Sequence, residues 1–209
     1  MKNVQSILTF VEEAERLKTV LRTAWLSDGQ RESTAAHSWR LALFAGILLD
    51  EFPELDGKKV LMLALVHDLG ELYDGDISAA LRPDAGEKYK KEKAAIDRLA
   101  AILGGEAGEK FKILWQEYEA GETGEARLIK ALDKAETIIQ HNQGKNPPDF
   151  DYDFNLEYGQ AYFQGGYFRR SSSGESGQEE MLISERGQEL LSQLRQKIDG
   201  DTRRRMEEE

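Results

Sequence analysis

LVHDLGELYDGDI, residues 65–77, is the stretch from which this chain is best interpreted. It follows an apolar run over residues 60–66 and places His67 and Asp68 side by side at the end of that run. A buried carboxylate beside an imidazole is energetically costly unless another group pairs with it, and a metal ion is a common partner. The pair is therefore the first candidate for metal binding.

Two further carboxylates follow within the same stretch. If the helix continues past Asp68, Glu71 lies three residues later and faces the same side one turn further on. The dipeptide Asp74-Gly75 predicts a turn, which returns Asp76 toward the pair. One short segment thus offers two metal ligands and two more acidic side chains in an apolar setting.

Length and composition predict one soluble domain. At 209 residues, with 40% hydrophobic and 32% charged residues, the chain resembles an ordinary globular protein with a single core. No run approaches the roughly 20 apolar residues that a membrane span needs, and the acidic start is unlike a signal peptide. The absence of cysteine excludes thiolate chemistry and fits a cytoplasmic protein. A net charge of −11 argues against a nucleic acid polymer as partner.

The spacing of apolar residues predicts an all-α fold. We expect helices at 4–21 with Asn3 as the cap, from Ser33 or Thr34 to Leu49, from 57 to 67 capped by Asp56, and at about 87–103, 107–118 and 124–140. The second helix is apolar nearly all round after Trp39, so we expect it to be central. No strand-like alternation of convincing length is present.

The sequence changes character after Gly144. Asn146-Pro147-Pro148 interrupts the helix, and the aromatic, acidic segment 149–163 is apolar enough to pack back on the domain. Residues 171–180 predict a flexible link, residues 182–198 a last amphipathic helix, and residues 201–209 a disordered end. We therefore expect a domain at 1–165, followed at 166–209 by a flexible link and a helical tail.

Metal ligands are offered by three separate helices. The chain has three histidines, and His37 and His67 fall on different helices. One such histidine alone is more often a hydrogen-bonded core residue. Asp133 lies beside apolar positions on a third helix, where an aspartate needs a partner, although its spacing equally allows it to face solvent beside neighbouring lysines. Together with Asp68 these residues form a nitrogen and oxygen set that suits a divalent metal with open positions.

Several segments in the same order resemble the HD-domain metal-dependent phosphohydrolases. ESTAAHSWRLALFA, from residue 32, is similar to the family's ESVAEHSW, and LALVHDLGELYDGDI, from residue 63, to its MALVHDLAExxxGDI. LWQEYEAGETGEARLIKALDKAETIIQ, from residue 114, resembles LWxEYE…EAxxxxDKxExxxQ, which is typical of the branch of bacterial 5′-deoxynucleotidases. The resemblance covers about residues 17–140.

The resemblance implies an HD-domain helical bundle with a metal site between its central helices. It implies one divalent metal, which is Mn, Co, Zn, Fe, Ni or Mg, held by His37, His67, Asp68 and Asp133. The implied substrate is a small-molecule nucleotide, and the implied reaction removes the 5′-phosphate from (deoxy)nucleoside monophosphates. A homodimer is also consistent with it. Hydrolysis of another phosphoester, cyclic or pyrophosphorylated, and a non-catalytic nucleotide-sensing module stay open as alternatives.

The resemblance also implies roles around the metal. Glu71 matches the glutamate that transfers a proton, and Asp76 matches the aspartate near the sugar and phosphate. Arg22 and Trp25 resemble an arginine and a tryptophan that hold phosphate and sugar. The alternative role of Glu71 is that of a surface or salt-bridging glutamate, but its position beside the His67–Asp68 pair favours the functional role. Arg22 fits a cation at a helix C-terminus equally well, and Trp25 a core residue. His141, after the last family-like helix, is expected to be an ordinary C-terminal histidine.

Two positions depart from the family pattern. Ala36 stands where an acidic residue is usual before the first histidine, so a contact to ligand or substrate is expected to be missing. Gly70 replaces an alanine before Glu71, which we expect to loosen a helical turn by about 1 kcal/mol. Neither change removes a metal ligand.

Overall fold

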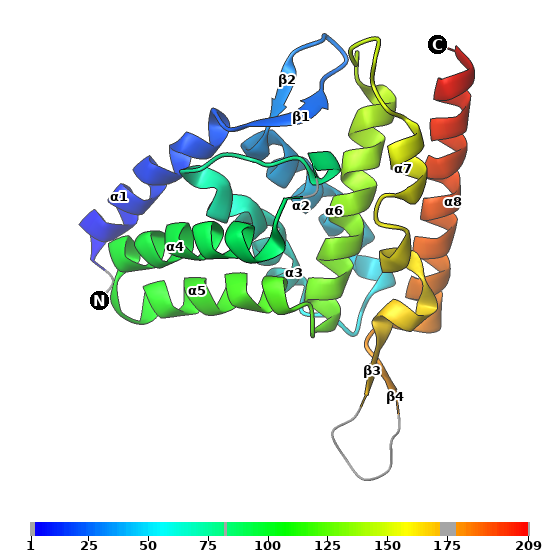
Figure 1. The fold of residues 1–209 in the computed structure, drawn as a ribbon. Coiled ribbons are helices and arrows are strands. Elements are labelled where there is room, and N and C mark those ends of the chain that lie inside the picture. The colour runs from blue at the N-terminus through cyan, green and yellow to red at the C-terminus, as the bar shows by residue number, and fades with distance from the viewer. Residues whose placement is uncertain (1–2, 82, 172–178, 209) are drawn as a thin grey trace.

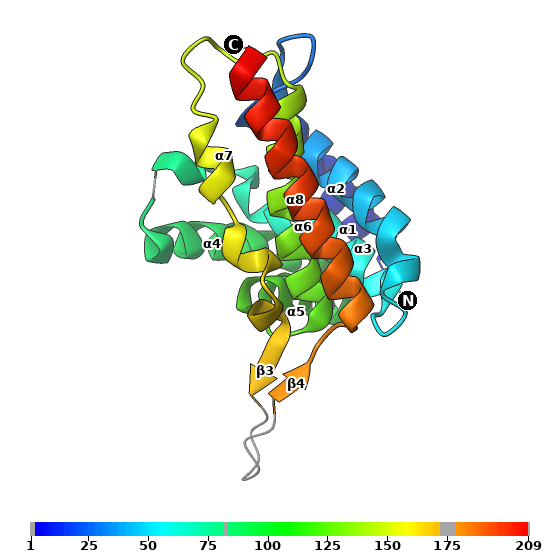
Figure 2. The same cartoon turned by 90° about the vertical axis from the view of Figure 1, so that its right-hand side faces the viewer.

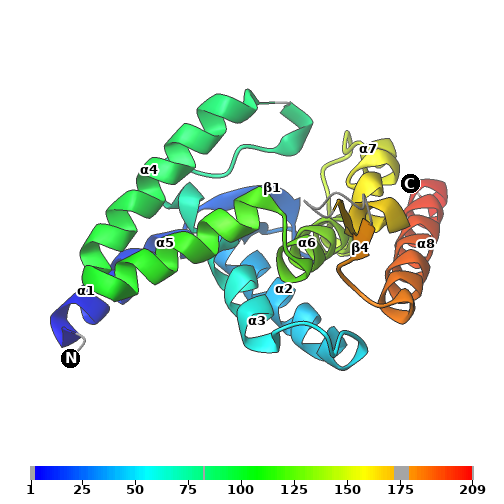
Figure 3. The same cartoon turned by 90° about the horizontal axis from the view of Figure 1, so that it is seen from below.

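Helix α6, Gly124–Gln143, lies at the centre of the molecule, with α4 and α5 on one side and α7 and α8 on the other (Figure 1 and Figure 3). The computed structural model describes residues 3–81, 83–171 and 179–208. Its helices and strands are α1 (Val4–Ala14), β1 (Leu21–Trp25), β2 (Arg31–Ser33), α2 (Thr34–Leu48), α3 (Gly57–Val66), α4 (Ala85–Leu103), α5 (Gly105–Ala120), α6, α7 (Asp153–Glu157), β3 (Arg169–Ser171), β4 (Glu179–Met181) and α8 (Glu185–Glu208). Short 3₁₀ helices connect them: η1 (Glu15–Lys18), η2 (Leu49–Glu51), η3 (His67–Leu72), η4 (Ala79–Leu81), η5 (Gln160–Phe163) and η6 (Gly165–Phe168).

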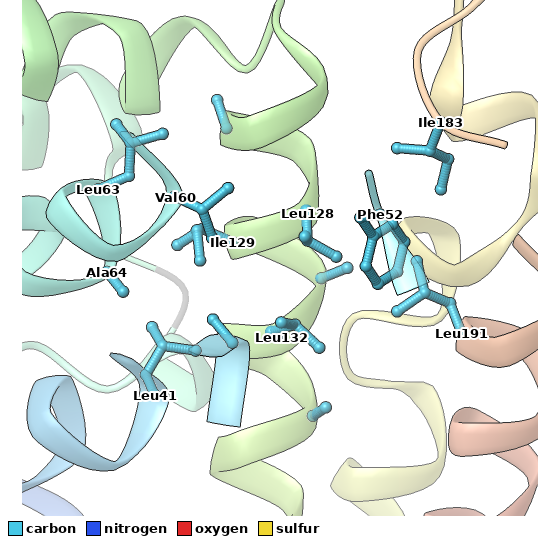
Figure 4. Close-up of a cluster of buried hydrophobic side chains, with 14 of the residues drawn as sticks. Leu41, Phe52, Val60, Leu63, Ala64, Leu128, Ile129, Leu132, Ile183 and Leu191 are labelled. Atoms are coloured by element: carbon cyan, nitrogen blue, oxygen red, sulfur yellow. The ribbon is translucent and has the colours of Figure 1, made fainter. Parts of the chain in front are cut away.

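The main hydrophobic core surrounds α6. Figure 4 shows Leu128, Ile129 and Leu132 of α6 between Leu63 of α3 on one side and Leu191 of α8 on the other. A second cluster joins α4 and α5 to the segment that follows α3. The expected helical bundle is confirmed, and no helix among residues 3–81, 83–171 and 179–208 is long and apolar enough to cross a membrane.

The predicted helix ends agree with local hydrogen bonds. The side chain of Asn3 accepts a hydrogen bond from the backbone N–H of Gln5, and that of Asp56 accepts from Lys58 and Lys59 at the start of α3. These caps satisfy N–H groups that have no partner inside the helix. The predicted boundaries of α2, α4, α5 and α6 are reproduced within a few residues.

The segment that carries the HD pair is not a continued α-helix. The α-helix ends at Val66, and His67–Leu72 forms the 3₁₀ helix η3, where side chains three residues apart eclipse. Glu71, three residues after Asp68, therefore still lies on the same side, and both line one cavity. The indole of Trp115 donates to the carbonyl of His67 at 3.2 Å. Gly70 packs directly against Glu92 of α4, so its missing side chain allows α4 to approach and does not loosen an α-helical turn.

Two short hairpins were missed by the expectation of an all-α fold without strands. β1 pairs antiparallel with β2, and β3 with β4. The first helix ends at Ala14 and continues only as the 3₁₀ helix η1 to Lys18, so Arg22 lies on a strand. Strands of five and three residues are too short for alternation to be recognised in the sequence.

Helix α2 is central on one face only. Leu41 and Ala45 are completely buried, but Trp39, Leu43 and Ile47 are 62%, 50% and 70% exposed. These three lie four residues apart along α2 and form one exposed stripe. A helix that is apolar nearly all round therefore presents an uncovered face in the single chain.

The C-terminal segment packs on the domain, as expected for residues 149–163. Figure 2 shows α8 running beside α6. The predicted disorder at residues 201–209 is wrong as far as Glu208, because α8 continues through it and Thr202 is buried, donating to Asn142 at 3.0 Å. Of the predicted link, residues 172–178 lie outside the described residues, and the flanking residues form β3 and β4.

Candidate metal centre and catalytic pocket

The side chains of four candidate ligands, from α2, η3 and α6, lie close together. His37 Nε2 lies 3.1 Å from Asp133 Oδ1 and 3.8 Å from Asp68 Oδ2. His67 Nε2 lies 3.0 Å from the same Asp68 oxygen. The ligand atoms of His37, His67 and Asp133 lie within 4.8 Å of one another, and all three side chains are buried. Asp133 thus faces the interior and not solvent.

The free atoms of this cluster suit a divalent cation. His37 Nε2, His67 Nε2 and Asp68 Oδ2 are buried and make no hydrogen bond with any described residue, although they lie close together. The Nδ1 atoms of both rings are engaged elsewhere, that of His67 with the carbonyl of Ala64 at 2.9 Å and that of His37 with Glu136. Because these oxygens accept, each Nδ1 carries the proton and each Nε2 offers a lone pair to the centre.

The electrostatics of the cluster favour positive charge. Burial opposes ionisation of Asp133, but the charges of Lys134 and His37 outweigh it and hold its pKa well below its usual range. Burial also opposes protonation of His37, yet Glu136 and Asp133 raise its pKa to about 10. A cation at this centre would replace that proton as the source of positive charge.

Glu136 is a site residue that sequence reasoning did not assign. It is almost fully buried one turn after Asp133 on α6, where it contacts both His37 Nδ1 and the guanidinium of Arg40. The spacing of Asp133 and Glu136, three residues apart in a predicted helix, is the signal that places them on one face. A carboxylate behind a histidine fixes its tautomer and its orientation.

A cavity of about 380 Å³ opens beside the cluster. Asp68 and Asp133 line it together with three cationic side chains, Arg22, Lys88 and Lys134. Arg22 Nη1 lies 3.5 Å from Asp68 Oδ2, and its Nη2 donates to the hydroxyl of Thr137 at 2.9 Å. In a chain of net charge −11, three cations thus lie beside the metal candidates, in a cavity that is also lined by carboxylates.

Glu71 also lines this cavity. It is buried, with one carboxylate oxygen 3.4 Å from Lys88 Nζ and the other without a hydrogen-bond partner in the described chain. Burial and the charges of Asp68 and Asp76 raise the pKa of Glu71 to about 9. It is therefore protonated at neutral pH and able to donate a proton.

The remaining candidates are divided between the cavity and its surroundings. Asp76 lines the cavity, as does His141, which is buried with its Nδ1 2.7 Å from Asn155 Oδ1. The Trp25 ring is not among the residues that line this cavity and packs edge-on against Phe150 with centroids 6.1 Å apart. Ala36 is half-buried near the start of α2, and its N–H is bonded to Ser33.

A family model of the HD domain matches residues 14–166. The chain belongs to the HD-domain family. In this HD domain the adjacent histidine and aspartate are His67 and Asp68, so the resemblance seen in the sequence is confirmed at the level of the family.

Curated relatives agree with that assignment. The chain is 38% identical over 154 residues to the 5′-deoxynucleotidase HDDC2 of Dictyostelium discoideum, covering 69% of this chain and 80% of the relative. It is 34% identical over 141 residues to the human protein of the same name, covering 66% and 68%. These matches leave about a third of this chain outside each alignment.

Solved structures show the same fold. A protein of Magnetospirillum magnetotacticum, described as a predicted metal-dependent phosphohydrolase, superposes with a TM-score of 0.72 at 27% identity, covering 96% of this chain and 92% of that one. The PH0347 protein of Pyrococcus horikoshii superposes with a TM-score of 0.54 at 28% identity, covering 65% and 77%. The Magnetospirillum protein therefore shares elements of the C-terminal segment as well as the helical core.

Proposed function

We propose that this HD domain is a metal-dependent phosphohydrolase that removes the 5′-phosphate from deoxynucleoside monophosphates. The observation that carries the proposal is the cluster of four candidate ligand side chains, three of which have a buried atom without a hydrogen-bond partner among the described residues, beside a cavity that also holds Arg22 and a protonated Glu71. The substrate class comes from the relatives, several of which are named 5′-deoxynucleotidases at 31–38% identity.

His37, His67, Asp68 and Asp133 are the residues that would hold the metal. When bound, a divalent ion polarises the phosphate and lowers the pKa of water from 15.7 toward about 7, which makes a nucleophile available at neutral pH. Arg22 lies 3.5 Å from Asp68, close enough to the ligands to bind the phosphate and orient it. His37, His67 and Asp133 are buried, which limits the access of bulk water to the ligand atoms.

Loss of the nucleoside requires a proton on its 5′-oxygen. Glu71 carries that proton at neutral pH because burial and neighbouring carboxylates raise its pKa. Its position on η3, three residues after Asp68, places it on the cavity side of the ligands. General acid catalysis of this kind accelerates a reaction by about 10²–10⁴-fold. Asp76, in the same cavity, is proposed to contact the sugar.

Phosphate release tests the proposal. Purified protein is supplied in turn with Mn²⁺, Co²⁺, Zn²⁺, Fe²⁺, Ni²⁺ and Mg²⁺, and then with ribo- and deoxynucleoside monophosphates, cyclic nucleotides and nucleoside triphosphates. We expect release from deoxynucleoside monophosphates, and its loss in Asp68→Ala. Preference for cyclic or pyrophosphorylated nucleotides would favour another phosphohydrolase. Binding without release under every metal would favour a nucleotide sensor.

We also propose that two copies of the chain pair through one apolar face, made by Trp39, Leu43 and Ile47 of α2 with Met62 and Leu65 of α3. All five are at least 40% exposed, and α2 packs against α3. Soluble monomers seldom expose large contiguous apolar patches. A two-fold axis would place this uncharged stripe against its own copy, as in most homodimers.

A further inference from the structure

The pocket has an aromatic wall that comes from the C-terminal segment. Phe154 and Tyr158 line the same cavity as the metal candidates, and their rings stack with centroids 4.8 Å apart and planes 27° from parallel. Both residues lie at α7 or its C-terminal cap, in the part of the sequence where no family motif was recognised. We propose that this aromatic pair is the subsite for the nucleobase. The proposal rests on the proposed nucleotide substrate and adds the residues that recognise its base.

The lining of the cavity combines charged and aromatic side chains, as a nucleotide combines a phosphate and a base. Arg22 lies 3.5 Å from the metal candidate Asp68. Lys134, which pairs with the candidate ligand Asp133, lies 5.3 Å from the centre of the Tyr158 ring, so the aromatic pair is close to the charged groups. A phosphate suits the cations, and a flat, apolar base suits the stacked rings.

The cavity also has apolar lining from another part of the chain. The segment after Asp76 supplies Ile77 and Ala79, and the loop before α4 supplies Pro83. These side chains are apolar and carry no charge that would need solvation. They add apolar surface for a base in the cavity that holds the aromatic pair and Asp76.

Hydrogen bonds from α8 and α6 fix the short helix α7, which carries the aromatic pair. Arg195 of α8 is buried and donates to the carbonyls of Asn155, Leu156 and Tyr158 at 3.0, 2.8 and 2.6 Å. These carbonyls lie at the C-terminus of α7, where a cation also complements the helix dipole. Asn155 is completely buried and binds His141 of α6. The rings are therefore positioned before substrate arrives, which reduces the entropy lost on binding.

Deoxyribose 5-phosphate separates base recognition from the rest of the site, because it keeps the phosphate and sugar and lacks the base. We would measure kcat/KM for it and for deoxyadenosine 5′-monophosphate with the parent, Phe154→Ala and Phe154→Leu. The parent should prefer the nucleotide at least tenfold. Phe154→Ala should reduce that preference about tenfold through KM for the nucleotide alone, and Phe154→Leu should restore only part of it.

Tyr162→Ala is the matched control, because Tyr162 is an aromatic residue of the same segment that packs on Tyr167 and is not among the cavity lining. It should leave the preference unchanged. A parent that does not distinguish the two substrates, or a Phe154→Ala variant with the parent's preference, would overturn the base subsite. A misfolded variant would lose both substrates equally.

A failure of the proposed function would give a different experimental result from a failure of the base subsite. In that case the parent releases phosphate from neither compound. Equilibrium dialysis with deoxyadenosine 5′-monophosphate then decides the matter without turnover: Phe154→Ala should retain about tenfold less nucleotide than the parent if the pair binds the base. If parent and variant retain equal amounts of nucleotide, the aromatic pair does not bind the base. If the parent retains none, the protein does not bind this nucleotide and the proposed subsite is wrong as well.

Discussion

At the scale of single residues, the groups behind the metal candidates determine how those candidates are presented. Glu136 contacts His37 on the side away from the centre and shares its charge with Arg40. The same role for His67 falls to a backbone carbonyl, that of Ala64. His67 is thus held by the main chain and His37 by a side chain. Only the contact to His37 can be removed by substituting its partner.

Glu136→Ala should weaken metal affinity by about 10–100-fold, because a histidine that loses its outer carboxylate is no longer fixed in one tautomer. Glu136→Gln, which still accepts from Nδ1 but lacks the charge, should recover part of the loss. Affinity is measured by competition with a chelator. Glu125→Gln, on the same helix but paired with Lys59 3.2 Å away and apart from the cluster, should change nothing. Equal affinity in parent and Glu136→Ala would exclude the positioning role.

Glu71→Ala should lower kcat by more than tenfold while metal binding is retained, since Glu71 is not one of the proposed ligands. The pH dependence follows from its raised pKa: the proton is present below that pKa and is lost as the pH rises through it, so kcat falls on the alkaline side. Without a cation that pKa is about 9, and a bound cation lowers it. The alkaline limb should vanish in Glu71→Ala and persist in Glu87→Ala, an exposed control on α4. Full activity in Glu71→Ala would assign the proton to another group.

Gly70→Ala should destabilise the fold, although alanine favours helices. A Cβ at Gly70 would lie 2.6 Å from Glu92 Cβ and 3.1 Å from its Cα. Overpacking costs about 1–3 kcal/mol, which exceeds the gain of about 1 kcal/mol in helix propensity. Urea unfolding measures the difference. Gly46→Ala is the control, because Gly46 is an exposed residue of α2 whose Cβ would meet only Leu61 Cδ2 at 3.4 Å, and the change should be stabilising. A Gly70→Ala variant as stable as Gly46→Ala would mean that α4 moves away from the added methyl group at little cost in free energy.

At the scale of elements, the pocket is shaped by short pieces that lack strong sequence signals. The 3₁₀ helix η3 aims Asp68 and Glu71 inward, the β1 strand carries Arg22, and α7 carries Phe154. Each piece is fixed by a longer helix behind it: η3 by α4, β1 by α6, and α7 by α8. The long helices form the frame, and the short elements carry much of the pocket chemistry.

The tie between α6 and α7 should respond to pH through His141. Burial lowers the pKa of His141 below its usual 6.5, so the unfolded chain binds the proton more tightly than the folded one. Its stabilising contribution is complete above about pH 6.5 and is lost as the pH falls below that value. The slope is at most about 1.4 kcal/mol per pH unit. Urea unfolding of the metal-free protein between pH 8 and 5 should give a flatter profile for His141→Gln than for the parent, and identical profiles would contradict the assignment.

At the scale of the whole molecule, the apolar face on α2 and α3 predicts the oligomeric state. Size-exclusion chromatography with light scattering should give the mass of two chains, and Leu43→Glu should give one. The control is Ile113→Glu on α5, which is 59% exposed and lies outside that face, and it should leave the dimer intact. A parent that elutes as a monomer at tens of micromolar would contradict the proposal that two copies pair through this face.

The sequence predicts the long helices well and the pocket only in part. Periodic apolar residues specify α2 to α6, and the stretch around His67 specifies where the ligands meet. The β1–β2 hairpin is too short to carry a period, and the exposed stripe at Leu43 looks the same as a buried one when only periodicity is considered. Glu136 and Phe154 were not assigned for another reason: their roles depend on which distant residues they contact, and a single sequence does not contain those contacts.

The hydrogen bonds from Arg195 to the end of α7 affect how long a chain this enzyme needs to form its pocket. The family match ends at residue 166, and a chain trimmed there would keep all four metal candidates and lose the guanidinium that holds the three carbonyls. Such a fragment would be a metal site with one side of its pocket unanchored. The stretch that the family model matches is therefore shorter than the unit that shapes this pocket, and any minimal version of the protein has to include α8.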